Sequence, residues 1–315
     1  MVLHEFTVPA SAGHTQLHAV VWLPEGAPKA VLQISHGVSE YILRYAPFAK
    51  QLTERGFAVV GHDHLGHGGS VAKGAPRLYF GPKGSWFQVT EDLYTLRQKM
   101  GSVFPGLPYF LMGHSMGSFL ARTYLIRYPG TVNGAILMGT GQQPAPLLAA
   151  ARAVTAEEIR RVGEKKPSPL VEKLAFGAYN RQFAPNRTKS DWLSRSRENV
   201  DRYLADPLCG GTPTTGLFRE MLFGIAYISK LDHLKHMNLN TPILFISGAE
   251  DPVGENGKGV RRAYQNFQKV GVRSVELRLL PGLRHEILNE ACGQEIGASL
   301  CAWMEALLPE TQKPL

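Results

Sequence analysis

The residues with the clearest chemical potential are a serine enclosed by glycines, in the run Gly113-His-Ser115-Met-Gly117. An apolar stretch over 109–112 precedes this run, and a segment with helical spacing over 119–128 follows it. On a tight turn between a strand and a helix, the serine hydroxyl is raised above the sheet edge, and only glycine fits beside it. We therefore predict that Ser115 is a nucleophile.

A serine hydroxyl needs a base that removes its proton and an acid that orients the base. Asp251 follows an apolar strand predicted over 242–247, and His285 follows another predicted over 274–280. Both residues therefore stand just beyond the carboxyl end of a strand, at the same sheet edge as Ser115. The chain order Ser, Asp, His is typical of this kind of turn. The sequence thus predicts the catalytic set Ser115, Asp251 and His285.

Other residues compete for the two supporting roles. Glu250 adjoins Asp251, and we favour the aspartate because the shorter acid before Pro-Val fits the loop better. The chain has eleven histidines, of which His36 also follows a strand. His36 precedes the serine, however, which is the wrong order for this arrangement. His285 is therefore the preferred base.

Acyl transfer places negative charge on an oxygen atom, which backbone N–H groups can stabilise. The residue after the nucleophile lies at a helix N-terminus, so the N–H of Met116 is one predicted donor. The turn His36-Gly37 ends the strand predicted over 30–36, and the N–H of the next residue, Val38, is the second. Val38 and Met116 are thus the expected oxyanion hole.

Three histidines, His62, His64 and His67, have a spacing that resembles a metal site. Two of them stand at alternate positions where a predicted strand ends, so we favour structural packing and predict no metal site. Asp63 and the neighbouring glycines are expected to shape a loop that braces the floor of the active site.

Apolar strands and helical segments alternate along most of the chain. Strands buried on both faces form parallel sheets covered by helices. The expected fold is therefore α/β, with a mostly parallel eight-stranded sheet flanked by helices. From Gly141 to Ser229 helical patterns and loops replace the strands, which predicts a mostly helical cap inserted after the sixth strand. The core is then 1–140 and 230–315, and the cap 141–229.

Charge and composition exclude several classes of protein. The net charge is +8, and residues 141–230 hold 14 Lys and Arg against 9 Asp and Glu. These basic residues are scattered, which favours a solvated face and gives no case for nucleic-acid binding. No apolar run approaches the roughly 20 residues that span a bilayer. The N-terminus has no signal-peptide pattern, so we expect a cytoplasmic protein.

Taken together, these motifs resemble the α/β-hydrolase superfamily, and more narrowly its monoacylglycerol lipase and lysophospholipase branch. The segments that carry the resemblance are His36-Gly37, Asp63–Ser70, Gly113–Gly117, Asp251–Val253 and Arg284–Glu290. The resemblance implies a serine esterase with no cofactor. Its substrate would be a mono-acyl lipid or a related small ester, hydrolysed through an acyl-enzyme.

The resemblance also implies substrate-binding residues. Glu40 and Arg44 stand where monoacylglycerol lipases carry a Glu and an Arg that orient the oxyanion loop and contact the glycerol hydroxyls. Leu288 stands where animal members carry a second histidine. The acyl pocket is expected to take a minority of the cap's apolar residues, chosen from Leu147, Leu148, Leu174, Phe176, Phe183, Leu217, Phe218, Met221, Leu222 and Phe223.

Two other functions stay open. An N-terminal aminopeptidase of the proline iminopeptidase type shares this fold and triad, although the basic excess of the cap argues mildly against binding a free amine. A hydrolase-like binding protein with slow turnover would also keep these residues. The sequence leaves open the acyl-chain length, the head group, the oligomeric state and peripheral membrane contact through the cap.

Overall fold

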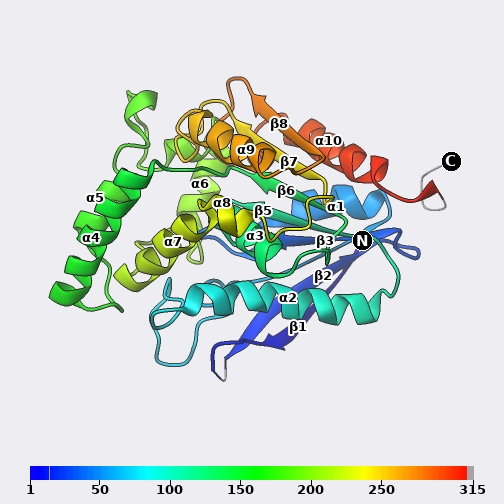
Figure 1. Ribbon diagram of the computed structural model, residues 1–315, viewed down its shortest axis with the longest axis horizontal. Helices are drawn as coiled ribbons and strands as arrows, with labels where there is room; N and C mark the ends of the chain where they lie inside the picture. The colour runs from blue at the N-terminus through cyan, green and yellow to red at the C-terminus, as the bar shows by residue number, and fades with distance from the viewer. Residues whose placement is uncertain (14, 311–315) are drawn as a thin grey trace.

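The computed structural model describes residues 1–13 and 15–310, which fold around one eight-stranded sheet (Figure 1). The strand order is β1-β2-β4-β3-β5-β6-β7-β8. The strands are β1 (Val2–Pro9), β2 (Gln16–Leu23), β3 (Ala30–Ser35), β4 (Phe57–His62), β5 (Tyr109–His114), β6 (Gly134–Met138), β7 (Ile243–Gly248) and β8 (Val275–Leu280). This is the α/β-hydrolase architecture that the sequence predicts.

The pairing of the strands determines where their ends meet. β2 is antiparallel to both β1 and β4, whereas β4, β3, β5, β6, β7 and β8 are mutually parallel. Ser35 pairs with Gly113, and Met138 pairs with both His114 and Ile246. The carboxyl ends of β3, β5, β6 and β7 therefore lie side by side, and this edge is where open α/β sheets bind ligands.

Helices cover both faces of the sheet. Helices α1 (Ala46–Glu54) and α10 (Gly293–Ala306) contact each other and share one apolar core with one face. Helices α2 (Ser85–Val103), α3 (Met116–Arg127) and α9 (Lys258–Lys269) pack on the other face. The central strands β3 to β7 are buried along their whole length, as their continuous apolar sequences predict.

The closing helix is shorter than the sequence pattern predicts. A helix over 287–308 is wrong, because a 3-10 turn at Ile287–Asn289 precedes α10, which begins at Gly293. The residues before α10 are engaged elsewhere. The N–H of Glu286 donates to the Leu193 carbonyl, and the Glu290 carboxylate accepts from the N–H of Arg195. These bonds join the segment after β8 to the segment between β6 and β7.

The chain between β6 and β7 is helical, and its residues, all described, contain no named strand. It holds α4 (Ala145–Val162), α5 (Pro169–Phe176), α6 (Arg197–Ala205), α7 (Thr215–Ile228) and α8 (Leu231–Leu234). Figure 1 shows α4 and α5 at the end of the molecule far from the C-terminus. The buried guanidinium of Arg122 donates to the carbonyls of Gly141 and Ile228, near the two ends of this segment. Within the described residues, no helix combines the length and apolar character that crossing a bilayer requires.

The edge of the sheet is joined to the β4 loop by a histidine between two acids. His18 Nδ1 lies 2.9 Å from Asp63 Oδ2, and its Nε2 lies 2.7 Å from Glu5 Oε2. The hydrogen bond to Asp63, supported by Glu5, outweighs burial and raises the pKa of His18 to about 9. The folded state therefore favours the protonated ring. This stabilisation is complete below the unfolded pKa of about 6.5 and is lost as the pH rises through about 9.

We expect His18→Gln to lower the free energy of unfolding by about 1–2 kcal/mol near pH 6 and by less near pH 10. Urea unfolding at the two pH values measures the difference. His4→Gln, an exposed change on the neighbouring strand β1, is the matched control and should have little effect at either pH. An equal loss at both pH values for His18→Gln would contradict the assigned charge.

Candidate active site

Ser115 occupies the turn between β5 and α3 in a backbone conformation that few residues adopt. Its φ of 53° and ψ of −122° lie outside the helical and extended regions. A Cβ on Gly113 would lie 2.3 Å from the Gly117 carbonyl oxygen, and one on Gly117 would lie 2.0 Å from the Ser35 carbonyl oxygen. Both positions therefore require glycine. The structure thus has the strained strand-to-helix turn that the sequence predicts here, and Ser115 on this turn is largely buried.

The structure brings Asp251 and His285 together from loops that follow β7 and β8. His285 Nδ1 lies 2.9 Å from Asp251 Oδ2, and both side chains are buried. Asp251 also accepts from the Ser247 hydroxyl at 3.2 Å and from the Val253 N–H at 2.9 Å. These donors keep the carboxylate in place, so Nδ1 of His285 carries the proton and Nε2 is free to act as a base.

Ser115 and His285 line the same pocket, whose volume is about 250 Å³. Val38 lies in its wall, as do Trp192 and Tyr203 from the helical segment between β6 and β7. The Trp192 ring packs against the His285 ring with 5.1 Å between centroids. Among the described residues no hydrogen bond joins Ser115 Oγ to His285, a contact that often tightens only when substrate binds.

The two expected oxyanion donors form no hydrogen bond within the described part of the chain. The N–H groups of Val38 and Met116 donate to none of its backbone or side-chain acceptors. His36 lies behind them, where its Nδ1 donates to the Gly37 carbonyl at 2.7 Å. His36 Nε2 accepts from the N–H of His64 at 2.9 Å. The β4 loop thus braces the loop that carries Val38.

Glu40 and Arg44, expected from the resemblance to contact substrate, belong to a buried polar network. Glu40 Oε1 accepts from the Gly37 N–H at 2.6 Å, which orients the loop that carries Val38. Arg44 donates to Glu40 Oε2 at 2.8 Å and forms a two-pronged pair with Glu286 at 2.9 Å. Glu40 also lines the pocket of Ser115, whereas Arg44 does not.

Charge in this network is compensated by neighbours. Burial opposes the ionised form of Glu40, but the hydrogen bond and charge of His114, together with Arg44, hold the pKa of that carboxyl below its usual range. Burial likewise opposes ionisation of Glu286, and Arg44 and Asn199 outweigh it, so its pKa is also lowered. Both carboxylates are therefore charged at neutral pH.

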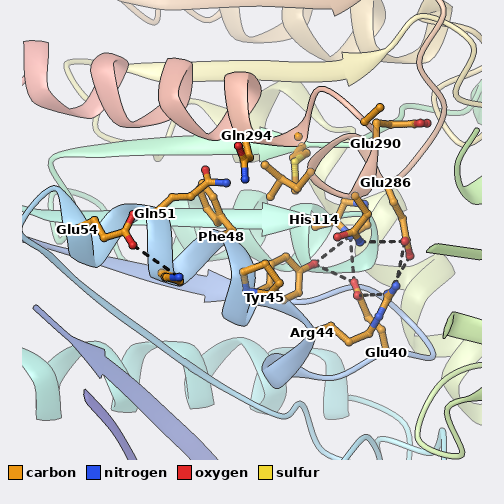
Figure 2. Close-up of a pocket in the computed structure, with 17 residues that line it drawn as sticks. Glu40, Arg44, Tyr45, Phe48, Gln51, Glu54, His114, Glu286, Glu290 and Gln294 are labelled. Carbon is orange, nitrogen blue, oxygen red and sulfur yellow. Dashed lines mark hydrogen bonds and ion pairs between the residues drawn. The ribbon is translucent and has the colours of Figure 1, made fainter. Parts of the chain in front are cut away.

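A second cavity lies on the other side of this network (Figure 2). It measures about 450 Å³, and Glu40, His114 and Glu286 line both this cavity and the pocket of Ser115. Gln51 and Gln294 also line it, from α1 and α10. Leu288, at the position of the second histidine in animal lipases, is part of its wall. The network is thus a shared partition between the two spaces.

The histidine cluster after β4 is packed rather than open. His62, His64 and His67 are fully buried, and the His64 ring lies 4.2 Å from the His36 ring and 5.2 Å from the His62 ring. Burial lowers the pKa of His62 and His67 to about 3. Across residues 1–13 and 15–310, no group of His, Cys, Asp and Glu side chains is placed to hold a metal ion.

Sequence reasoning missed several residues that surround Ser115. Of the ten apolar cap residues expected as pocket candidates, Phe176 lines the Ser115 pocket, whereas Leu147 and Leu174 are exposed and Leu217 and Phe218 are core residues. Glu286 and Asn199 were not predicted, although Glu286 adjoins His285. The one sequence signal that points to Glu286 is its position next to the expected base.

Comparison with known proteins identifies the family of this chain. Residues 26–291 match the family Hydrolase_4, described as serine aminopeptidase, S33. Human monoglyceride lipase is 29% identical over 272 residues, covering 85% of this chain and 79% of that protein. Monoacylglycerol lipase of Mycolicibacterium smegmatis is 27% identical over 303 residues, covering 94% and 95%.

Solved structures give the same fold. A thermostable carboxyl esterase from Bacillus coagulans, in complex with glycerol, superposes with a TM-score of 0.90 at 27% identity, covering 98% of this chain and 100% of that one. Because the family match extends over most of the chain, the protein belongs to the Hydrolase_4 family of α/β-hydrolases and is a hydrolase.

Proposed function

We propose that the protein is a serine carboxylic-ester hydrolase that acts on mono-acyl lipids or related small esters. The observation that carries the proposal is the Asp251–His285 hydrogen bond of 2.9 Å beside a pocket that also contains Ser115. The lipase and esterase relatives support hydrolysis of an ester. Residues 141–229 are proposed as the cap over this pocket.

The arrangement supports a two-step reaction. His285 Nε2 takes the proton of Ser115 as the serine oxygen attacks the ester carbonyl carbon, and Asp251 stabilises the imidazolium. The N–H groups of Val38 and Met116 hold the oxyanion. His285 then protonates the leaving alcohol, which leaves an acyl group on Ser115. Water activated by His285 releases the carboxylic acid and restores the serine. No cofactor takes part.

The proposed substrate contacts are fewer than the resemblance implies. Glu40 faces the Ser115 pocket and can accept from an alcohol hydroxyl, whereas the guanidinium of Arg44 is occupied by Glu40 and Glu286. We therefore propose that Arg44 supports binding mainly by holding Glu40. The expectations of a cytoplasmic protein and of no nucleic-acid partner are also kept as proposals. Membrane contact through the cap and the oligomeric state stay open.

The family description favours one alternative, an aminopeptidase. Such an enzyme needs acids that hold a free amine. Of the carboxylates in the Ser115 pocket, Glu40 and Glu286 are already paired with cations, and Glu172 is left without such a pair among the described residues. The pocket therefore fits an uncharged ester better. A binding protein with slow turnover would share the geometry and differs only in rate.

Ser115→Ala is expected to reduce hydrolysis of simple aryl esters to below about 1% of the native rate, because no other group supplies the attacking oxygen. Circular dichroism should show an unchanged fold. Intact-mass measurement after treatment with a fluorophosphonate should show one adduct on the native protein and none on Ser115→Ala. Ser102→Ala, on the exposed side of α2, is the control. Retention of more than a few per cent of activity would refute the assignment.

A substrate panel separates the three candidate functions. Monoacylglycerols should be cleaved at least about 100-fold faster, by kcat/KM, than aminoacyl-arylamides, because the pocket has one unpaired acid for a free amine. The reverse order would make the protein an aminopeptidase. Failure of the native protein both to turn over esters and to react with the fluorophosphonate would favour the binding protein.

Gly37→Ala tests the oxyanion loop. The new Cβ would lie 2.6 Å from Glu40 Oε1 and 3.1 Å from Ser115 Cβ, so either the loop or the Glu40 carboxylate that orients it must move. A displacement near 1 Å at the reacting centre lowers rates by about 100-fold. We expect such a loss in kcat with a small change in melting temperature. Gly26→Ala, where nothing lies within 4 Å of the new Cβ, should retain native activity; an unchanged rate for Gly37→Ala would contradict the role of this loop.

A further inference from the structure

The reaction above makes no use of His114, the last residue of β5 and the immediate neighbour of Ser115. Its imidazole is buried between two loops that the reaction needs. Nδ1 lies 3.0 Å from Glu40 Oε1, on the loop that carries Val38. Nε2 lies 3.4 Å from the carbonyl oxygen of His285. Figure 2 shows the ring at the meeting point of Glu40, Tyr45 and Glu286.

The partners of His114 determine its charge. A neutral imidazole has one donor and one acceptor nitrogen, but both nitrogens of His114 face atoms that can only accept. Glu40 is an ionised carboxylate, and the His285 carbonyl has no proton. Tyr45 Oη donates to Glu40 at 2.9 Å, so it faces Nδ1 with a lone pair at 3.1 Å. The ring satisfies all three only when both nitrogens carry protons.

The surrounding charges favour this imidazolium. Burial would lower the pKa of His114, but Glu40, with smaller contributions from Glu286 and Asp251, outweighs it and raises that pKa above its ordinary value. Glu286, Arg44, Glu40 and His114 are paired in that order, so a charged His114 makes negative and positive groups alternate along the network. Each buried ion is then compensated by a neighbour of opposite charge. The titratable and charged groups that face the ring or its partners are Glu40, Tyr45, His36, Arg44, Asp251, His285 and Glu286.

The His114 ring also lies against the catalytic ring. The centroids of His114 and His285 are 4.7 Å apart. Both rings pack over Gly139, where a Cβ would lie 3.1 Å from His285 Cε1 and 3.2 Å from His114 Cδ2. The His114 ring therefore packs directly against the expected catalytic ring and also bonds to the backbone of the loop that carries it.

We propose, on the basis of the proposed ester hydrolysis, that His114 is a positioning residue that is positively charged at working pH. Its two ring N–H groups join the oxyanion loop, through Glu40, to the loop that carries His285. When His285 accepts the serine proton during the reaction, the Asp251 carboxylate and the oxyanion offset the added charge. His114 itself neither gives nor takes a proton in the reaction.

The direct test is nitrogen NMR of the native enzyme labelled with ¹⁵N-histidine. At pH 7, both ring nitrogens of His114 should have imidazolium shifts, whereas an unperturbed histidine has mostly lost its proton above about pH 6.5. His114→Asn assigns the signals by their loss. A neutral His114 tautomer at pH 7 would overturn the proposal. This readout uses the native protein and does not depend on activity.

The second test separates a loss of turnover from a loss of folding. His114→Asn removes the bridge between the oxyanion loop and the His285 loop, so kcat for an aryl ester should fall by about 10-fold or more while KM changes by less than about 2-fold. The melting temperature of the variant reports folding in parallel. A lower melting temperature with an unchanged kcat would show a merely structural role and would overturn the proposal.

Failure of this inference is distinct from failure of the ester hydrolase. Fluorophosphonate labelling of native Ser115 reports the proposed function alone. A native protein that labels and turns over esters, but whose His114 is neutral or whose His114→Asn variant keeps the native kcat, would reject only the role of His114. A native protein that does not label at Ser115 would reject the proposed function.

Discussion

The hydrogen bond between His285 Nδ1 and Asp251 Oδ2 is the contact on which the site depends. It joins the loops after β7 and β8 and determines which nitrogen of His285 faces the pocket. The parallel register of the sheet makes it possible, because β5, β6, β7 and β8 are neighbours in that order and their carboxyl ends lie at the same edge. The strained turn at Ser115 then places an oxygen in the same pocket.

A second set of contacts holds the oxyanion loop. Glu40 binds the Gly37 N–H, and Arg44 connects Glu40 to Glu286, the residue after the expected base. Asn199 of α6 donates to Glu286 at 2.7 Å, which extends the connection into the proposed cap. Movement of the cap would therefore reach both the oxyanion loop and the His285 loop. Because replacing a buried ion pair by apolar side chains is often neutral or stabilising, we interpret this network as positioning the two loops.

Much of the framework could be predicted from local sequence. The apolar strands, the glycines around Ser115 and the loops that hold Asp251 and His285 all leave local patterns, and the structure places the last two in contact. The network could not be predicted in this way. Arg44 and Glu286 are 242 positions apart, and no local pattern reports such a pair. Nor could the late start of the closing helix be predicted, because it follows from the bond between Glu290 and the distant Arg195.

The central claim is that Ser115, His285 and the two backbone N–H groups converge on one reacting carbon atom. A crystal structure of the protein after reaction with an alkyl phosphonate ester tests this directly. We predict phosphorus bonded to Ser115 Oγ, with the phosphoryl oxygen about 3 Å from the nitrogens of Val38 and Met116 and His285 Nε2 facing the leaving-group side. An adduct on another residue, or a phosphoryl oxygen that contacts neither N–H, would contradict the account.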